Sequence, residues 1–448
     1  MVFSFYIWLL IIKEGNMADI SYEARKERTK WFMDARFGMF IHWGLYAIPG
    51  RGEWVRERES ITHEAYVPYF DEFDPVRYNP KKWAKIAKSA GIKYAVITAK
   101  HHEGFCLFDS KYTDYKATNT KAGRDLIMEF TEAFRNEGIK IGYYYSLFDW
   151  NHPDYPHYGD MCHPERNMDK NKGKTHDFPK YIEYIHNQVR ELLTNYGKID
   201  IMWFDFSYGE MTGEKWEATK LVEMIRSLQP HIIFDNRLIA SEMPGGPLDE
   251  VPLYYAGDFY SPEQIIPTEG LTDSLGRDVP WESCVTLNNH WGYGSKDLQF
   301  TKARNIVQML VNTTSKNGNL LINIGPNAKG EFPDEMIPIL KKTGKWLKKN
   351  GDSIYGCGKA MFPKPEWGRY TQKGNKLYAH VYERGPAQLR FDGLKGKITS
   401  ARLLSDGSEL DLVDWRKDYP NDAFVDLVFC KLPDDKATVI ELTLKEEN

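Results

Sequence analysis

Short hydrophobic runs alternate with helix-periodic stretches from residue 38 to about residue 350. The runs are rich in β-branched and aromatic residues, which favours strands, and the stretches between them repeat apolar positions every three to four residues, which favours helices. The predicted strands span residues 38–44, 94–102, 140–146, 199–205, 231–237, 281–287 and 319–325. The predicted helices span residues 80–91, 123–138, 178–197, 214–230 and 301–318. This alternation is typical of βα units that build a parallel sheet.

The number and spacing of these units favour a (β/α)8-like TIM barrel in which one strand cannot be located. A doubly wound open sheet is the alternative, but no glycine-rich phosphate-binding turn supports it. After residue 350 the pattern changes to short alternating strands separated by Gly, Asp and Pro, which predicts an antiparallel β-sandwich. We therefore expect a barrel domain over residues 17–350 and a sandwich over 351–448. The insertion 147–178, rich in His, Asp and Pro, is predicted to form a loop over the barrel mouth.

The first twelve residues are apolar, but the run is too short to span a bilayer, and neither a preceding basic residue nor a small-x-small cleavage site marks it as a signal peptide. Met17 offers a second start, so residues 1–16 are expected to be a non-structural extension. The cysteines are scattered without a CxxC pair, which favours a reducing compartment over a disulfide framework; they are Cys106, Cys162, Cys284, Cys357 and Cys430. A cytoplasmic location follows as an expectation.

Composition narrows the class of ligand. The net charge of -4 comes from 59 basic and 63 acidic residues and shows no basic stripe, which argues against nucleic acid as a partner. Aromatic residues make up 14% of the chain, and their faces suit the C–H faces of sugars. A small neutral carbohydrate is therefore the expected ligand, with no membrane partner and with a homo-oligomer left open.

Polar side chains gather where the predicted strands end, and in a barrel these ends carry the chemistry. Asp205, which closes the run "IDIMWFD", raises two alternatives: a cap for the next helix, or a carboxylate held for a substrate. Polar groups at several other strand ends favour the second. They are His42, Lys100, His101, His102, Glu103, Tyr144, Tyr145, Ser146, Trp203, Asn236 and Arg237, and neighbouring loops add Glu53, Trp54, Arg56, Asp258 and Glu263.

A metal site is the first competing interpretation of these residues, as in amidohydrolase barrels. The first strand carries His-Trp-Gly where chelation from one strand would need His-x-His, and no Cys/His cluster completes a ligand set. No metal and no cofactor are therefore expected. A serine or cysteine nucleophile is also disfavoured, because no G-x-S-x-G motif occurs and no cysteine stands beside a predicted base.

Two carboxylates flanked by aromatic and neutral hydrogen-bonding groups match the needs of glycoside cleavage. One carboxylate must be ionised to attack the anomeric carbon, and the other must be protonated to release the alcohol. Asp205 can stay charged near Arg237. Glu263, bracketed by "FYSP" and "QII", is predicted to be partly desolvated, which would raise its pKa.

The motifs "ARFGMFIHWGLYA", "GEWV", "YAVITAKHHEGFCLFDS", "YYYSLFDW", "MWFDF" and "NGNLLINIGP" resemble those of the α-L-fucosidases of glycoside hydrolase family 29. The resemblance covers roughly residues 22 to 350, and the predicted sandwich is also in keeping with that family. It implies an imperfect barrel followed by a sandwich, and cofactor-independent hydrolysis of terminal α-L-fucosyl residues with retention, through a covalent fucosyl-enzyme.

Carried over by motif, Asp205 is the nucleophile and Glu263 the acid/base, with Glu269 and Glu282 left open for the second role. The sequence departs from the common family pattern at Phe206, where many members carry Gly, and at Glu103, where Asp is commoner, which bears on substrate preference. Residues that the resemblance places around the fucose ring are His42, Glu53, Trp54, His101, His102, Tyr145, Trp203 and Arg237.

Two other classes of function stay open at the level of sequence: a catalytically silent fucose-binding protein and a metal-dependent barrel hydrolase. Retention of both Asp205 and a strand-end glutamate favours the enzyme, because a binding module needs neither. The fucosyl linkage and the aglycone are not determined by these motifs.

Overall fold

The structure is a computed structural model that describes residues 20–240, 245–383, 388–413, 417–427 and 432–446. The expected extension, residues 1–16, lies outside this range. Within the described part, no helix combines the length and the apolar character that crossing a bilayer demands.

Seven parallel strands form one sheet in the order β5-β4-β3-β2-β1-β7-β6. Each strand lies inside a predicted strand or overlaps it, so the predicted βα alternation is confirmed. The strands are nearly all buried, because a parallel sheet is covered on both faces. Their bounds are Phe37–Ile41 (β1), Tyr94–Lys100 (β2), Lys140–Ser146 (β3), Ile201–Asp205 (β4), Ile233–Phe234 (β5), Glu282–Thr286 (β6) and Asn319–Ile324 (β7).

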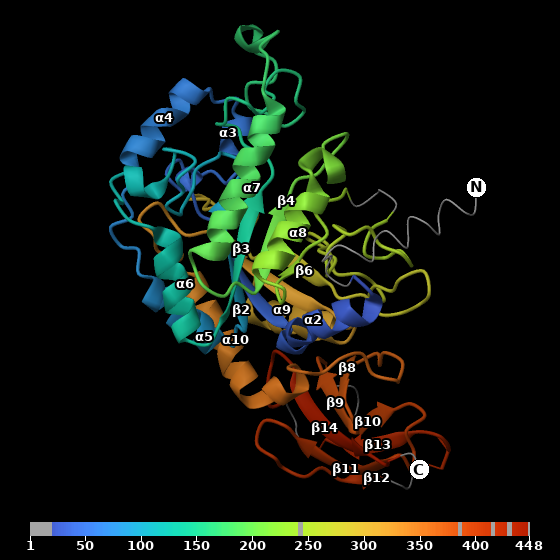
Figure 1. Cartoon of the computed structure of the whole chain (residues 1–448). Coiled ribbons are helices and arrows are strands. Elements are labelled where there is room, and N and C mark those ends of the chain that lie inside the picture. The colour runs from blue at the N-terminus through green and yellow to red at the C-terminus, as the bar shows by residue number, and fades with distance from the viewer. Residues whose placement is uncertain (1–19, 241–244, 384–387, 414–416, 428–431, 447–448) are drawn as a thin grey trace, which may run out of the picture.

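Most helices lie on the outer face of this sheet (Figure 1), whereas α2 packs Phe32 and Ala35 against side chains of the inner face. Asn79 caps the N-terminus of α5 by accepting a hydrogen bond from Lys82 N (2.9 Å), and Asp125 caps α6 by accepting one from Met128 N (2.8 Å). Gly91 ends α5 at a φ of 88°. The helices are Tyr22–Ala35 (α2), Val55–Arg58 (α3), His63–Glu72 (α4), Pro80–Ala90 (α5), Leu126–Asn136 (α6), Phe178–Thr194 (α7), Ala218–Leu228 (α8), Ala303–Thr314 (α9) and Met336–Asn350 (α10). Of these, α3, α4 and α10 are not predicted by the sequence pattern, and α10 packs against both α5 and α9.

Alternation along the strands separates two apolar layers. Side chains on the inner face of the sheet, among them Phe40, Tyr144 and Trp203, form one buried cluster, and those on the outer face pack beneath the helices in another. Neighbouring residues of a strand therefore serve different layers. This separation decides which strand-end side chains reach the site.

The two edge strands of the sheet, β5 and β6, are bridged by an irregular segment, residues 258–263. Asp258 N donates to Phe234 O (2.8 Å) on one side, and Glu282 N donates to Tyr260 O (2.9 Å) on the other. Asp258 itself is buried and paired with Arg28 and Arg226. The segment joins both edge strands through isolated bridges, and it forms no regular strand of its own.

The C-terminal part consists of two antiparallel sheets. One has the order β10-β13-β12 and the other β11-β14-β9-β8, and side chains from both sheets share one buried cluster. Figure 1 shows these strands grouped at one end of the molecule, beyond α10. Their bounds are Gly368–Lys373 (β8), Lys376–Val381 (β9), Gln388–Phe391 (β10), Ile398–Leu403 (β11), Leu412–Val413 (β12), Ala423–Asp426 (β13) and Thr438–Leu444 (β14).

Candidate active site

A pocket opens at the carboxyl ends of the parallel strands, where the sequence predicts the site. It contains every predicted site residue except Glu53 and Tyr145. The lining residues are Phe40, His42, Trp54, His101, His102, Tyr144, Trp203, Asp205, Phe206, Arg237, Glu263, Cys284 and Trp291.

Asp205 is the last residue of β4 and its carboxylate is held by two donors. Tyr144 donates its hydroxyl to Oδ2 (2.7 Å), and Arg237 donates Nη1 to Oδ1 (2.8 Å). The next helix, α8, begins only at Ala218 and has Glu217 at its N-cap position. Asp205 is therefore not a helix cap, and its carboxylate is fixed at the pocket wall with only a small exposed surface.

Arg237 joins Asp205 to Glu263. Its Nη2 lies 2.9 Å from Glu263 Oε2, while its Nε donates to Ser261 Oγ (3.1 Å). Beneath it, the ring of Trp203 lies 4.5 Å from the guanidinium carbon, a cation–π contact. Arg237 therefore contacts Asp205 through Nη1 and Glu263 through Nη2 of the same guanidinium group.

The Glu263 side chain is 42% exposed in this state. The segment 258–263 carries Glu263 at the open rim of the pocket, where more than half of its side chain is covered. The two sequence alternatives are placed elsewhere. Glu269 is exposed and lines a separate hollow with Lys359 and Arg369, and Glu282 is buried below the pocket.

Glu282 supports the pocket floor. Its Oε1 accepts the indole N–H of Trp203 (3.0 Å) and its Oε2 accepts the hydroxyl of Tyr94 (2.6 Å). Burial raises the pKa of Glu282 to about 7, against the opposing effect of these two hydrogen bonds. It orients Trp203 under Arg237 and does not reach the pocket itself.

His42 has a defined tautomer. Asn323 donates its amide nitrogen to Trp291 O (2.6 Å), so its Oδ1 is the acceptor that faces His42 Nδ1 at 2.7 Å. His42 Nδ1 therefore carries the proton and its Nε2 is an acceptor. Burial lowers the pKa of His42 to about 3, which keeps the ring neutral.

His101 and His102 both line the pocket, because they follow the last residue of β2 and escape the alternation of the strand. Their ring centroids lie 4.1 Å apart. His102 Nδ1 contacts Ser146 Oγ (2.7 Å), and its Nε2 lies 3.9 Å from Asp205 Oδ2. His101 Nδ1 is buried and has no hydrogen-bond partner among the described residues. Burial lowers the pKa of both rings well below the usual range, so both are neutral.

Two residues of the predicted set, Tyr145 and Glu53, do not line the pocket. Strand alternation turns Tyr144 into the pocket and Tyr145 to the outer face, where its hydroxyl donates to Gln188 (2.7 Å). Glu53 is buried behind the pocket and accepts the backbone N–H of Gly292 (2.8 Å), next to the lining residue Trp291. Its role in this state is to hold that loop.

Sequence reasoning missed Phe40, Trp291 and Cys284 as lining residues and chose the wrong tyrosine of the Tyr144–Tyr145 pair. Tyr144 pairs in register with Trp203, and both face inward. Which of two consecutive strand residues faces inward can be known only from the register between neighbouring strands. The sequence does not contain this register, so it offers no signal that selects Tyr144.

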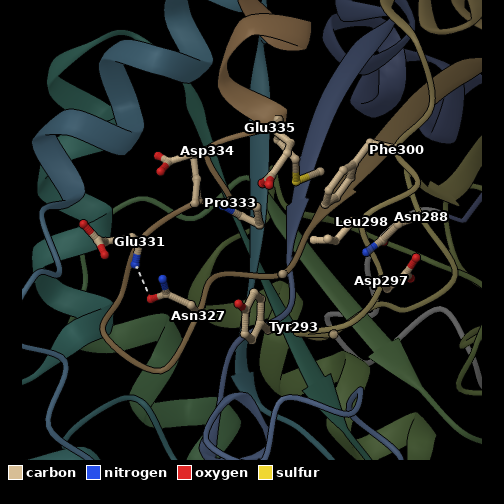
Figure 2. A pocket seen from close by; sticks show the side chains of 14 residues that line it. Asn288, Tyr293, Asp297, Leu298, Phe300, Asn327, Glu331, Pro333, Asp334 and Glu335 are labelled. Atoms are coloured by element: carbon tan, nitrogen blue, oxygen red, sulfur yellow. Dashed lines mark hydrogen bonds between the residues drawn. The ribbon is translucent and has the colours of Figure 1, made fainter.

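A separate hollow lies between the loops 288–300 and 325–336 (Figure 2). Figure 2 shows Asp297, Glu331, Asp334 and Glu335 around it. None of the predicted site residues lines it. In the described part of the chain, no group of three His, Cys, Asp or Glu residues is arranged to hold a metal ion, here or elsewhere.

Phe206, directly after Asp205, has a backbone φ of 79°, in the region that favours glycine. Its ring packs against Phe148, His102 and Trp54 at centroid distances of 4.3, 4.9 and 5.4 Å. The aromatic contacts hold a bulky residue in an unfavourable backbone conformation, and such strain is typical of functional sites.

Comparison with known proteins gives the family of this site. The family described as "Alpha-L-fucosidase" matches residues 13–352. The chain belongs to this family. It is 30% identical to human plasma alpha-L-fucosidase over 358 residues, which are 74% of this chain and 70% of that protein. It is 26% identical to an alpha-L-fucosidase of Dictyostelium discoideum over 388 residues, 79% of this chain and 77% of that one.

Solved structures agree with this assignment. Alpha-L-fucosidase isoenzyme 1 from Paenibacillus thiaminolyticus is 57% identical, with a TM-score of 0.92 over 94% of this chain and 100% of that one. A GH29 alpha-L-fucosidase from Bacteroides thetaiotaomicron, 30% identical with a TM-score of 0.82 over 96% and 98% of the two chains, was trapped as a covalent intermediate with 2-fluoro-fucosyl fluoride, using a Glu-to-Gln mutant. Retaining hydrolysis of α-L-fucosides, which the sequence predicts, is confirmed for the family of this chain.

The strain at Phe206 gives a first prediction, about stability. Both Phe206→Ala and Phe206→Gly remove the ring and keep the positive φ, but only Phe206→Gly also removes the Cβ that strains this backbone conformation. We expect the glycine variant to be the more stable of the two by about 1 kcal/mol, because glycine adopts a positive φ without the Cβ penalty. Urea denaturation of both variants measures this difference. Equal free energies of unfolding would show that the backbone at this position is not strained.

Glu282 gives a second prediction, about pH. Its pKa rises from 4.5 to about 7 on folding, so its stabilising effect is complete below about pH 4.5 and is lost as the pH rises through 7. Glu282→Gln keeps an amide of similar shape and removes the titration. The free energy of unfolding of this variant should therefore fall less steeply between pH 5 and pH 7, by up to about 1.4 kcal/mol per pH unit.

Urea denaturation of wild type and variant at matched pH values measures the two slopes. Burial also raises the pKa of Glu103 to about 7, but Glu103 contributes equally to both proteins, so the difference between the slopes isolates Glu282. Parallel pH profiles would contradict the assignment of this titration to Glu282.

Proposed function

We propose that this chain removes terminal α-L-fucosyl residues from oligosaccharides or glycoconjugates, with Asp205 as nucleophile and Glu263 as acid/base. The observation that supports the proposal best is the bridge of Arg237 between these two carboxylates at the mouth of one pocket. A carboxylate pair around one glycosidic bond is what retaining hydrolysis requires.

In the first step, an Asp205 oxygen bonds to the anomeric carbon while the bond from that carbon to the leaving oxygen breaks. Glu263 gives its proton to the leaving oxygen, so the aglycone departs as a neutral alcohol. The hydrogen bonds from Tyr144 and Arg237 hold the Asp205 carboxylate in position for this attack.

Glu263 must be protonated for this step, although the unliganded state pairs it with Arg237. A bound sugar would cover the exposed Glu263 carboxylate and separate it from the guanidinium. Desolvation and loss of a cation both favour the protonated form of a carboxyl group. In the second step, Glu263 accepts a proton from water, whose oxygen bonds to the anomeric carbon as Asp205 leaves.

Neutral imidazoles suit a sugar without a charged group. His42 Nε2 is an acceptor for a ring hydroxyl, because its Nδ1 is already bonded to Asn323. Trp54 and Trp203 line the same pocket and offer aromatic faces to the C–H bonds of the ring. The GH29 relative trapped with a fucosyl ligand supports fucose as that sugar.

The finer architecture belongs to the same proposal. The segment 258–263 links β5 to β6, which supports a closed, imperfect (β/α)8 barrel over residues 17–350. A common buried cluster between two antiparallel sheets supports a sandwich over residues 351–448. The cytoplasmic location and the state of oligomerisation stay predictions of the sequence.

A chromogenic α-L-fucoside, with and without a chelator, tests the function. We expect hydrolysis at the same rate in both conditions, since the proposed chemistry uses only carboxylates. Fucose binding without hydrolysis would favour the silent binding protein. Loss of activity on chelation would favour the metal-dependent hydrolase.

Rescue chemistry tests Asp205 and Glu263 separately. Asp205→Gly should lose activity by a factor on the order of 10⁴ or more, because it removes the nucleophile. Azide can occupy the cavity and displace the aglycone directly while Glu263 still donates its proton. Turnover should return and yield a fucosyl azide of inverted configuration, since one displacement replaces two.

Glu263→Ala should still form the fucosyl-enzyme from aryl fucosides, because good leaving groups need little protonation. Azide should then attack the fucosyl-enzyme and give an azide of retained configuration. Product analysis by NMR separates the two outcomes. Inversion from Glu263→Ala, or its full activity on a natural oligosaccharide, would contradict the acid/base assignment.

A further inference from the structure

A second hollow adjoins the pocket on the side of Glu263. Asp205, Phe206, Arg237 and Glu263 line both, so the two spaces meet at the carboxylate pair. The outer hollow continues along an apolar wall that none of the predicted site residues forms. This wall consists of Phe206, Tyr208, Ile239, Tyr260, Pro262 and Ile265.

Three polar side chains along this wall are already used within the protein. Ser207 donates its hydroxyl to Arg237 O (2.8 Å), and Ser261 donates its hydroxyl to Asn236 Oδ1 (2.9 Å). Tyr208 donates its hydroxyl to Asp160, in the loop that follows β3. The wall therefore offers mainly ring faces and aliphatic carbons.

Ile265 is 61% exposed at the end of this wall, and Phe206 is held at its inner end at a φ of 79°. An exposed isoleucine gains from an apolar surface that covers it. The leaving oxygen must lie next to Glu263 to receive its proton, so the group attached to that oxygen extends into this hollow.

We propose that this wall is an aglycone site that selects leaving groups with a flat apolar face next to the scissile bond, either an aryl ring or the C–H face of a pyranose. This inference rests on the proposed function and assigns a class of substrate to it. Phe206 forms the inner boundary of the site and Ile265 its outer boundary.

The experiment compares substrates with and without an aglycone. α-L-Fucosyl fluoride carries the same sugar and no aglycone, so kcat/KM for an aryl α-L-fucoside divided by kcat/KM for the fluoride isolates the contribution of the hollow. Ile265→Ser should lower this ratio roughly tenfold, the effect of removing an aliphatic contact from an apolar site. Hydrolysis of the fluoride also reports that the variant is folded.

Leu275→Ser is the matched control, because Leu275 is 56% exposed, lies between β5 and β6 like Ile265, and is not part of the wall. Its ratio should equal that of the wild type. A fucosyl disaccharide serves as the second arm. If Ile265→Ser lowers the ratio only for the aryl fucoside, the site binds an aryl ring. If it lowers the ratio only for the disaccharide, the site binds the C–H face of a pyranose. If it lowers both ratios, the site accepts either group.

Unchanged ratios in Ile265→Ser, or equal drops in both variants, would overturn the aglycone site while leaving the proposed function intact. If wild-type protein hydrolysed neither the fluoride nor the fucosides, the proposed function would fail first and the aglycone site with it.

Discussion

The Arg237 guanidinium is the interaction on which the site depends. Burial by itself lowers the pKa of this group, and the charges of Asp205 and Glu263 overcome that effect and raise it well above its usual value. A cation that is largely removed from water, as Arg237 is at 20% side-chain exposure, is stable only when its charge and its hydrogen-bond donors are satisfied. The Arg237 guanidinium contacts the carboxylates of Asp205 and Glu263, the hydroxyl of Ser261 and the ring of Trp203. These contacts link the positions of the four side chains.

The side chains below Arg237 explain why its contacts are held in place. Trp203 lies under Arg237 because Glu282 holds its indole N–H, and Tyr94 holds Glu282 from the other side. These side chains come from three strands, β2, β4 and β6, so the parallel sheet fixes their spacing. Substitution of Glu282 should therefore displace Trp203 and, through it, Arg237 and the two carboxylates, even though Glu282 does not contact the pocket.

The sequence predicted the positions of the strands, and most of the site, because these depend on local pattern. Strand ends were recognisable from short apolar runs followed by polar residues, as at Asp205. What the local pattern could not determine depends on pairing between distant segments. The choice between Tyr144 and Tyr145 depends on the register of β3 against β4, and the exposure of Glu263 depends on how residues 258–263 bridge two edge strands. Neither is a property of one segment.

The neutral and the charged side chains of the pocket lie in separate places. The imidazoles of His42, His101 and His102 are neutral because burial lowers their pKa values. The ion pairs of the pocket gather instead at Asp205, Arg237 and Glu263, where we propose that the glycosidic bond is cleaved. A neutral sugar can then be desolvated against neutral donors and acceptors without placing an unpaired charge in the pocket. The same separation disfavours a charged sugar, since the ring site offers no counter-ion beyond those that the reaction itself uses.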